Sequence, residues 1–259
     1  MIVDLVMWTF NGEKTLDVVL KRIGLVIPKE CVNQKIIVDD CSTDSTVKIA
    51  LSHGWRVVPN RGKGISDGAN TALDLVVTPF YCSFEQDVLL ADDWWIKVSK
   101  LIKENDVVCG VRLPNAPKAL RAIEEYAHEN YRRGKLYCKT IDNTIYKTEV
   151  IRRVRGYPNI HSNVGVDAAL AFKVIACGFC WVTDFDLVSV HLRNGVKGEL
   201  HHNFWYGKEA GTLLGDGKRL LFSPIRGLMI AYKKRSIGAL FLYPLLKLAK
   251  FIGVISQNV

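Results

Sequence analysis

Residues 36–44, IIVDDCSTD, decide the fold class, because an apolar, strand-like run ends there on a cluster of carboxylates. The same pattern returns in residues 80–87, FYCSFEQD. Acidic side chains at the carboxyl ends of neighbouring strands lie where open α/β sheets bind their ligands. Carboxylates that converge there repel one another unless they share a cation, and a hard divalent ion that also holds phosphate oxygens is the usual solution. The two stretches therefore suggest a site for a nucleotide diphosphate.

Strand-like and helix-like segments alternate on either side of these stretches. Short apolar runs, as at residues 2–8 and 55–58, precede segments in which apolar residues follow helical spacing, as at residues 13–23. This alternation predicts an α/β fold whose doubly wound, mostly parallel sheet carries helices on both faces. We also expect Ser42 to cap the helix that follows the first acidic cluster.

The composition limits the classes of partner. With 259 residues, 49% of them hydrophobic, the chain can bury a full core. Its net charge of +9 favours anionic partners such as nucleotides, lipid phosphates or an acidic membrane surface. Nucleic acid is not expected, because the chain has no run of five basic residues and no nucleic-acid-reading motif. Seven scattered cysteines favour free thiols in the cytoplasm, and the N-terminus does not resemble a cleaved signal peptide.

The most apolar part of the sequence is near its C-terminus. Residues 237–255 are largely apolar but contain Pro244, Lys247 and Lys250, and the basic run 233–235 precedes them. A simple spanning helix needs about 20 clean apolar positions. The pattern instead predicts an amphipathic helical tail that makes peripheral contact with a membrane, at its cytoplasmic face. A C-terminal helix packed on the body of the protein is the alternative.

Taken in order, the motifs of the chain resemble those of the GT-A fold family 2 glycosyltransferases. Each motif is short, and their order and spacing carry the resemblance. It implies a GT-A, Rossmann-like domain with a nucleotide-sugar-binding half at residues 1–110 and an acceptor-binding half at residues 111–200. The helical tail would then occupy residues 201–259. The motifs are TFNGE at 9–13, VDDCSTDST at 38–46, NRGKG at 60–64 with Asn70, FEQD at 84–87, NTIYKTEV at 143–150, GVD at 165–167 and GF at 178–179.

The resemblance implies a divalent cation, Mn²⁺ or Mg²⁺, that bridges the diphosphate of the donor. Asp87 ends the metal-binding acidic triplet of the family. Glu85 takes the first place, where Asp is more common, and would reach the metal through water or contact the donor sugar. His191 resembles an additional metal or phosphate ligand, with a polar, non-ligand histidine as the alternative, and Arg193 would clamp a phosphate.

The nucleoside would be held at the first acidic cluster. Asp39 and Asp40 resemble the pair that hydrogen-bonds the base and the ribose, although neighbouring strand residues point to opposite sides and the sequence leaves open which one faces inward. Thr9 and Asn11 would flank the base, with ordinary turn chemistry as the alternative. Lys63, between two glycines, would reach the diphosphate, unless it is only a loop lysine.

Besides Glu85, two further positions depart from the family pattern. The family often places Arg before the residue that matches Asn70, a donor-binding position, whereas this chain has Ala69, so that contact is missing or comes from Arg61. Asp167 matches the last acid of a second motif, with Val166 in place of the preceding acid. Asp167 would be the catalytic base, and a plain helix N-cap is the alternative.

These residues favour a metal-dependent, inverting glycosyltransferase of the hexosyltransferase type. It would move a sugar from a UDP- or GDP-sugar donor to an acceptor, and the tail suggests a lipid-linked acceptor. A polyprenyl-phosphate glycosyltransferase is a second hypothesis, and a catalytically silent nucleotide-sugar-binding protein a third. A nicotinamide-dependent oxidoreductase is disfavoured, because no Gly-x-Gly-x-x-Gly turn follows the first strand.

Overall fold

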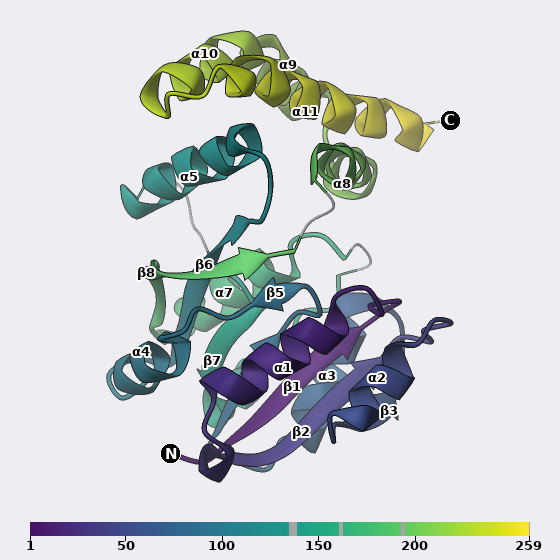
Figure 1. Ribbon diagram of the computed structural model, residues 1–259, viewed down its shortest axis with the longest axis vertical. Coiled ribbons are helices and arrows are strands. Elements are labelled where there is room, and N and C mark those ends of the chain that lie inside the picture. The colour runs from purple at the N-terminus through teal and green to yellow at the C-terminus, as the bar shows by residue number, and fades with distance from the viewer. Residues whose placement is uncertain (135–138, 161–162, 193–194, 259) are drawn as a thin grey trace. The chain divides into compact units, whose positions relative to one another are not determined.

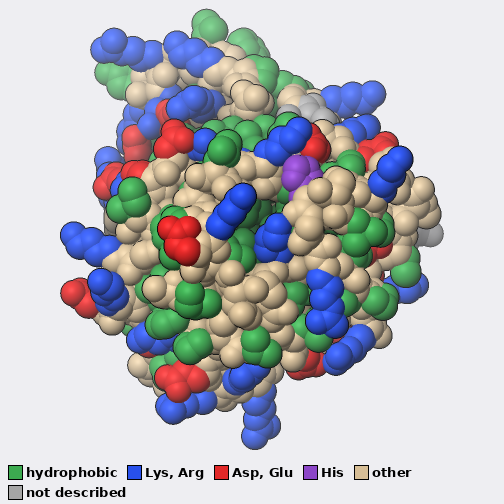
Figure 2. Space-filling view, turned by 60° about the horizontal axis from the view of Figure 1, so that its bottom comes forward, with side chains coloured by type: hydrophobic (Ala, Val, Ile, Leu, Met, Phe, Trp, Pro, Cys, Tyr) green, Lys and Arg blue, Asp and Glu red, His purple; other side chains and the backbone are tan. Residues whose placement is uncertain are grey.

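A computed structural model describes residues 1–134, 139–160, 163–192 and 195–258 of the chain. The chain forms two compact units. The first contains Met1–Arg112 and Tyr137–His191, and the second contains Leu113–Leu136 and Leu192–Val259. The division of function expected at residues 110 and 200 stays a prediction. Basic side chains are spread widely over the face of the molecule in Figure 2, in keeping with the net charge of +9.

An eight-stranded sheet forms the frame of the first unit, in the order β3-β2-β1-β4-β7-β6-β8-β5 (Figure 1). The strands β3, β2, β1 and β4 run parallel, while β7 runs antiparallel to both β4 and β6, and β5 runs antiparallel to β8. The strands are β1 Val3–Thr9, β2 Val32–Asp39, β3 Arg56–Pro59, β4 Phe80–Phe84, β5 Val88–Leu89, β6 Val107–Pro114, β7 Asn143–Lys147 and β8 Trp181–His191.

Helices cover both faces of this sheet, which confirms the doubly wound α/β prediction. Figure 1 shows α1 and α3 on opposite sides of the parallel strands. Alternate residues of β1 point to opposite faces of the sheet. Val6 and Trp8 belong to the apolar core between the sheet and the helices α3 and α7, whereas Leu5 and Met7 are buried on the other face. The helices are α1 Leu16–Val26, α2 Thr46–Ser52, α3 Gly64–Leu75, α4 Trp94–Leu101, α6 Thr148–Arg153 and α7 Val166–Ala176, with a 3₁₀ turn at Lys29–Cys31.

The second unit is helical and has an apolar core of its own. That core joins residues of α5, α10 and α11, among them Leu120, Ile230 and Leu246. Gly207 of α8 and Gly253 of α11 let these two helices approach closely, because a Cβ at either position would overlap a backbone carbonyl of the other helix. The helices are α5 Lys118–Arg132, α8 Gly195–Ala210, α9 Leu213–Leu221, α10 Ser223–Lys233 and α11 Ile237–Ile255, with a 3₁₀ turn at Ser256–Asn258.

The helical tail expected at the C-terminus is therefore present. Among the described residues, α11 is the one helix long and apolar enough to cross a membrane by length and composition, and a third of its most apolar stretch is buried in the protein.

Candidate functional site

The first acidic cluster lies at the carboxyl edge of the parallel strands. Thr9 and Asp39 are register partners at the ends of β1 and β2, and Thr9 Oγ1 donates to Asp39 Oδ1 at 3.1 Å. Asp39 is buried and also accepts hydrogen bonds from the backbone N–H of Ser42 at 2.8 Å and its hydroxyl at 2.6 Å. Asp40 is half-buried and accepts from the backbone N–H of Gly64 at 2.9 Å and from Asn60 Nδ2 at 3.0 Å. Asp39 thus fixes the turn after β2, and Asp40 fixes the loop before α3.

The expectation that Ser42 caps a helix is wrong. Helix α2 begins at Thr46, with Ser45 at its N-cap position. The Ser42 hydroxyl instead donates to Asp39 and accepts from the backbone N–H of Asn11 at 2.9 Å. Asn11 adopts a positive φ of 47°, and its Oδ1 accepts from the backbone N–H of Thr43 at 2.9 Å. The loops that follow β1 and β2 are therefore bound to each other.

A residue that sequence reasoning passed over joins the second acidic cluster to the first. Gln86 Nε2 donates to the carbonyl of Phe10 at 3.0 Å, and Gln86 Oε1 accepts from the backbone N–H of Phe10 at 3.1 Å. A Cβ on Gly12 would collide with the Gln86 amide, so only glycine leaves room for it there. The loop of Glu85 and Asp87 is thereby held against the end of β1, next to Asp39. The only sequence signal was the position of Gln86 between two predicted acids.

Glu85, Asp87 and His191 converge in a candidate metal centre. Each offers one ligand atom, and the three atoms lie within 4.8 Å of one another. His191 Nε2 is 3.0 Å from Asp87 Oδ2. The pairing of β5 with β8 creates this approach, because Val88 is the register partner of His191. Two carboxylates and an imidazole suit Mn²⁺, and carboxylates suit Mg²⁺, so these residues fit a divalent cation.

Arg112 orients His191 from the other side. Arg112 Nε donates to His191 Nδ1 at 3.2 Å, and its guanidinium forms an ion pair with the buried carboxylate of Asp142. A guanidinium can only donate, so Nδ1 accepts and the ring proton is on Nε2, facing Asp87. To bind a metal through Nε2, the His191 ring would have to carry its proton on Nδ1 instead. The hydrogen bond from Arg112 to Nδ1 would then be lost. Sequence reasoning missed Arg112, because its strand β6 comes near His191 only in the folded sheet.

The other predicted donor residues have different surroundings. Lys63 is exposed at the N-cap position of α3, where its backbone N–H donates to Asp67 Oδ2 at 2.9 Å. Asn70 makes two hydrogen bonds with the backbone of Tyr157, at 2.8 and 2.9 Å, and its role in donor binding stays a prediction. Arg193 lies outside the described residues.

Asp167 lies in the first turn of α7 and borders a cavity. Gly165, with φ 88°, takes the N-cap position, so Asp167 is not the N-cap residue, although its Oδ1 accepts from the backbone N–H of Ala168 at 2.7 Å. The cavity has a volume of about 450 Å³, and its walls include Phe172 and Ile175. The loop before α7 contacts the start of α3, because Asn163 Oδ1 accepts from the N–H of Ile65, the second residue of α3, at 2.9 Å.

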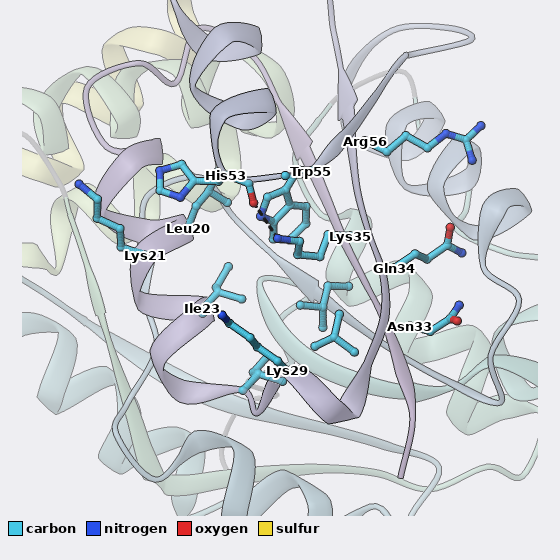
Figure 3. A pocket seen from close by; sticks show the side chains of 15 residues that line it. Leu20, Lys21, Ile23, Lys29, Asn33, Gln34, Lys35, His53, Trp55 and Arg56 are labelled. Carbon is cyan, nitrogen blue, oxygen red and sulfur yellow. Dashed lines mark hydrogen bonds between the residues drawn. The ribbon is translucent and has the colours of Figure 1, made fainter.

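A second cavity, of about 500 Å³, is basic but lies at the opposite edge of the sheet (Figure 3). It opens beside the first residues of β2 and β3, and Lys29, Lys35 and His53 line it. Lys35 Nζ donates to the carbonyl of His53 at 2.6 Å, while Arg56 points away from the cavity in Figure 3. Open α/β sheets bind ligands at the carboxyl ends of their strands, whereas this cavity lies at the amino ends.

The geometry agrees with the comparisons with known proteins. A model of the glycosyl transferase family 2 matches residues 4–179, which is more than half of the chain. The chain belongs to glycosyl transferase family 2. A comparison with curated protein sequences found no match.

Several solved structures have a fold similar to that of this chain. A mannosyltransferase from Pyrobaculum calidifontis, in complex with GDP-Man and Mn²⁺, superposes with a TM-score of 0.66 at 18% identity, over 95% of this chain and 73% of that one. For S. aureus TarS 1-349 in complex with UDP, the TM-score is 0.57 at 16% identity, over 81% of this chain and 65% of that one. Glucosyl-3-phosphoglycerate synthase from Mycobacterium tuberculosis, in complex with Mn²⁺, UDP and glucosyl-3-phosphoglycerate, superposes with a TM-score of 0.57 at 16% identity, over 83% of this chain and 79% of that one. At these identities the likeness establishes the fold, which is GT-A.

Proposed function

We propose that this family 2 chain is a metal-dependent, inverting glycosyltransferase that takes its sugar from a UDP- or GDP-sugar. The observation that carries the proposal is the convergence of Glu85, Asp87 and His191 beside the end of β1. Asp39 and Asp40 lie at the same edge, where the nucleoside would bind. The complexes of similar structures with GDP-Man and with UDP support this class of donor.

The metal cluster and the loop before α3 would together hold the diphosphate. Glu85, Asp87 and His191 would bind Mn²⁺ or Mg²⁺. When bound, such an ion supplies positive charge that stabilises the leaving nucleotide diphosphate. Lys63 would add a second positive charge, because its side chain is exposed beside the backbone that Asp40 holds in place.

Asp167 would act on the acceptor. In an inverting transfer the acceptor oxygen attacks the anomeric carbon, the bond from that carbon to the diphosphate breaks, and the hydroxyl proton passes to a base. The position of Asp167 at a cavity with Phe172 and Ile175 in its walls supports this role, and it favours an acceptor with an apolar part.

A polyprenyl phosphate is a second candidate acceptor, and the exposed side chains of the second unit support it. Its helices expose apolar and basic side chains together, as expected of a protein that meets a lipid-linked substrate at a membrane. A phosphate acceptor is already anionic, so it would need no base, and Asp167 would only position it. We further propose a cytoplasmic location, which the free thiols of the described cysteines support.

Calorimetric titration with UDP and GDP, with and without Mn²⁺, tests the proposal. We expect Mn²⁺ to tighten the binding of one nucleotide, and Asp87→Ala to remove this Mn²⁺ dependence. The matched control is Asp92→Ala, which removes a nearby exposed carboxylate that pairs with Arg22. Equal affinity of the Asp87→Ala variant with Mn²⁺ would reject the metal assignment. Slow hydrolysis of the bound sugar donor distinguishes an enzyme from a silent binding protein.

A further inference from the structure

The last three α-helices of the second unit present apolar side chains outward. In α10, Ile225, Leu228 and Tyr232 are 61%, 58% and 85% exposed. Their spacing of three and four residues places them on one side of the helix. The opposite side is the one that packs, since Gly227 is buried and a Cβ added to it would come 2.8 Å from the carbonyl oxygen of Leu240. The exposed stripe is therefore the outer face of a helix whose inner face is already used.

Helix α11 repeats this arrangement over its whole length. Its inner residues, such as Ala239, Leu242 and Leu246, are buried in the core of the unit. Its outer residues continue an exposed apolar stripe at helical spacing. Helix α9 and the residue that follows it, Phe222, also expose apolar side chains. The outward apolar surface consists of Leu213, Leu214, Leu221, Phe222, Ile225, Leu228, Met229, Tyr232, Ile237, Phe241, Leu245, Leu248, Ile252 and Ile255.

Most of the net positive charge of the chain lies in the same segment. Residues 213–259 contain eight Lys and Arg residues and one acidic residue, so they hold +7 of the chain's net charge of +9. The one acid, Asp216, is buried and is neutralised by Arg219 and Lys250. Among the basic residues, Arg226 and Lys233 are exposed on α10 beside its apolar stripe.

We propose that the outward apolar surface of α9, α10 and α11 binds an anionic lipid bilayer and lies in its interface. Apolar side chains flanked by exposed Lys and Arg match the acyl boundary and the anionic headgroups of such a bilayer. A second copy of the chain is a poor occupant, because the exposed Lys and Arg side chains beside the stripe, among them Arg226 and Lys233, would face their own copies. A spanning orientation of α11 is also disfavoured, because one side of the helix packs on protein and Lys247 lies 4.9 Å from the Tyr243 ring centroid within it.

Flotation of the full chain with vesicles tests this proposal. We expect the protein to float with vesicles of phosphatidylcholine and phosphatidylglycerol and to bind pure phosphatidylcholine at least about tenfold more weakly, because the exposed Lys and Arg are attracted to the anionic surface. The double variant Leu228→Glu, Tyr232→Glu should bind anionic vesicles at least about tenfold more weakly. Its matched control is Leu25→Glu, Val77→Glu, which changes apolar residues that are 80% and 73% exposed in the first unit.

Three results would overturn the proposal: no flotation of the unmodified chain, equal flotation of both double variants, or equal binding to neutral and anionic vesicles. A dimer in solution that only the α10 variant abolishes, without any vesicle binding, would assign the surface to a second copy instead. The charge variant Arg226→Glu, Lys233→Glu should lose binding to anionic vesicles while its circular dichroism stays unchanged. Mn²⁺-dependent nucleotide binding, measured on the same variants, should not change. A negative result in the vesicle experiments would therefore not contradict the proposed transfer reaction.

Discussion

The side-chain amide of Gln86 exchanges two hydrogen bonds with the backbone of Phe10, one in each direction. This pairing connects two loops that are 76 residues apart in the chain and that follow neighbouring parallel strands. Each loop carries one part of the candidate site, the acids of the metal cluster on one side and the residues near Asp39 on the other. The amide therefore fixes the separation between the candidate metal cluster and the acids at the end of β2.

Gln86→Ala should weaken Mn²⁺-dependent nucleotide binding several-fold, with little loss of stability. The two lost hydrogen bonds are worth about 1 kcal/mol each at most, because water can replace them at this exposed position. The loss of affinity follows from the loosened loop, which no longer holds Asp87 beside the end of β1. Calorimetry and thermal unfolding measure the two effects separately.

Gln34→Ala is the matched control for this prediction. Gln34 Nε2 also makes two hydrogen bonds, to Asp4 Oδ2 and to the carbonyl of Leu75, both at 3.0 Å, but at the start of β2. This variant should lower the melting temperature by a similar few degrees and leave nucleotide affinity unchanged. If both variants bind nucleotide equally well, the Gln86 contact is only structural.

Asp167→Asn should separate the two classes of acceptor. With a hydroxyl acceptor, loss of the general base should reduce the transfer rate at least about a hundredfold while donor affinity stays the same. With a phosphate acceptor the reduction should be small, because no proton has to be removed. The asparagine Oδ1 can still accept from the backbone N–H of Ala168, so the start of α7 should survive the change.

The control for Asp167→Asn is Asp17→Asn, which also removes a carboxylate from the first turn of a helix. The Asp17 carboxylate pairs with Lys21 and His53 on the surface. Rates should be measured in single turnovers with each class of acceptor. A hundredfold loss with a phosphate acceptor, or full activity with both acceptors, would mean that Asp167 does not remove an acceptor proton.

The strand-end acids were predictable because their position follows from local pattern alone. An apolar run that ends in carboxylates places them at the carboxyl edge wherever the strand lies in the sheet, and Asp39 and Asp87 are found there. Ser42 was misjudged because its hydroxyl has a closer partner in Asp39 than in any helix N–H. Arg112 could not be found, because its contact with His191 depends on strand order in the distal half of the sheet, which residue spacing does not determine.

Asp216 should make the stability of the second unit depend on pH. Burial alone would raise the pKa of its carboxyl, but the N–H of Thr212 and the charges of Arg219 and Lys250 outweigh it and lower the pKa. A carboxyl whose pKa is lowered by folding stabilises the folded state above its unfolded pKa, about 3.9, and this stability is lost as the pH falls through the folded pKa. Asp216→Asn should therefore cost about 1–3 kcal/mol at pH 7, and less as the pH falls below about 4.

Urea unfolding of both proteins across this pH range, followed by helical circular dichroism, measures the difference. Asp74→Asn is the control, because its ion pair with Arg61 is exposed on both sides and should contribute under about 1 kcal/mol at any pH. The direction in which this stability difference changes with pH tests the prediction. If the difference in unfolding free energy between the native chain and Asp216→Asn grew on acidification, the pKa of Asp216 would have to be raised in the folded state. The effect of burial would then outweigh that of the hydrogen bonds and charges of its partners. A difference that is constant with pH would mean that Asp216 stabilises α9 through packing and not through its charge.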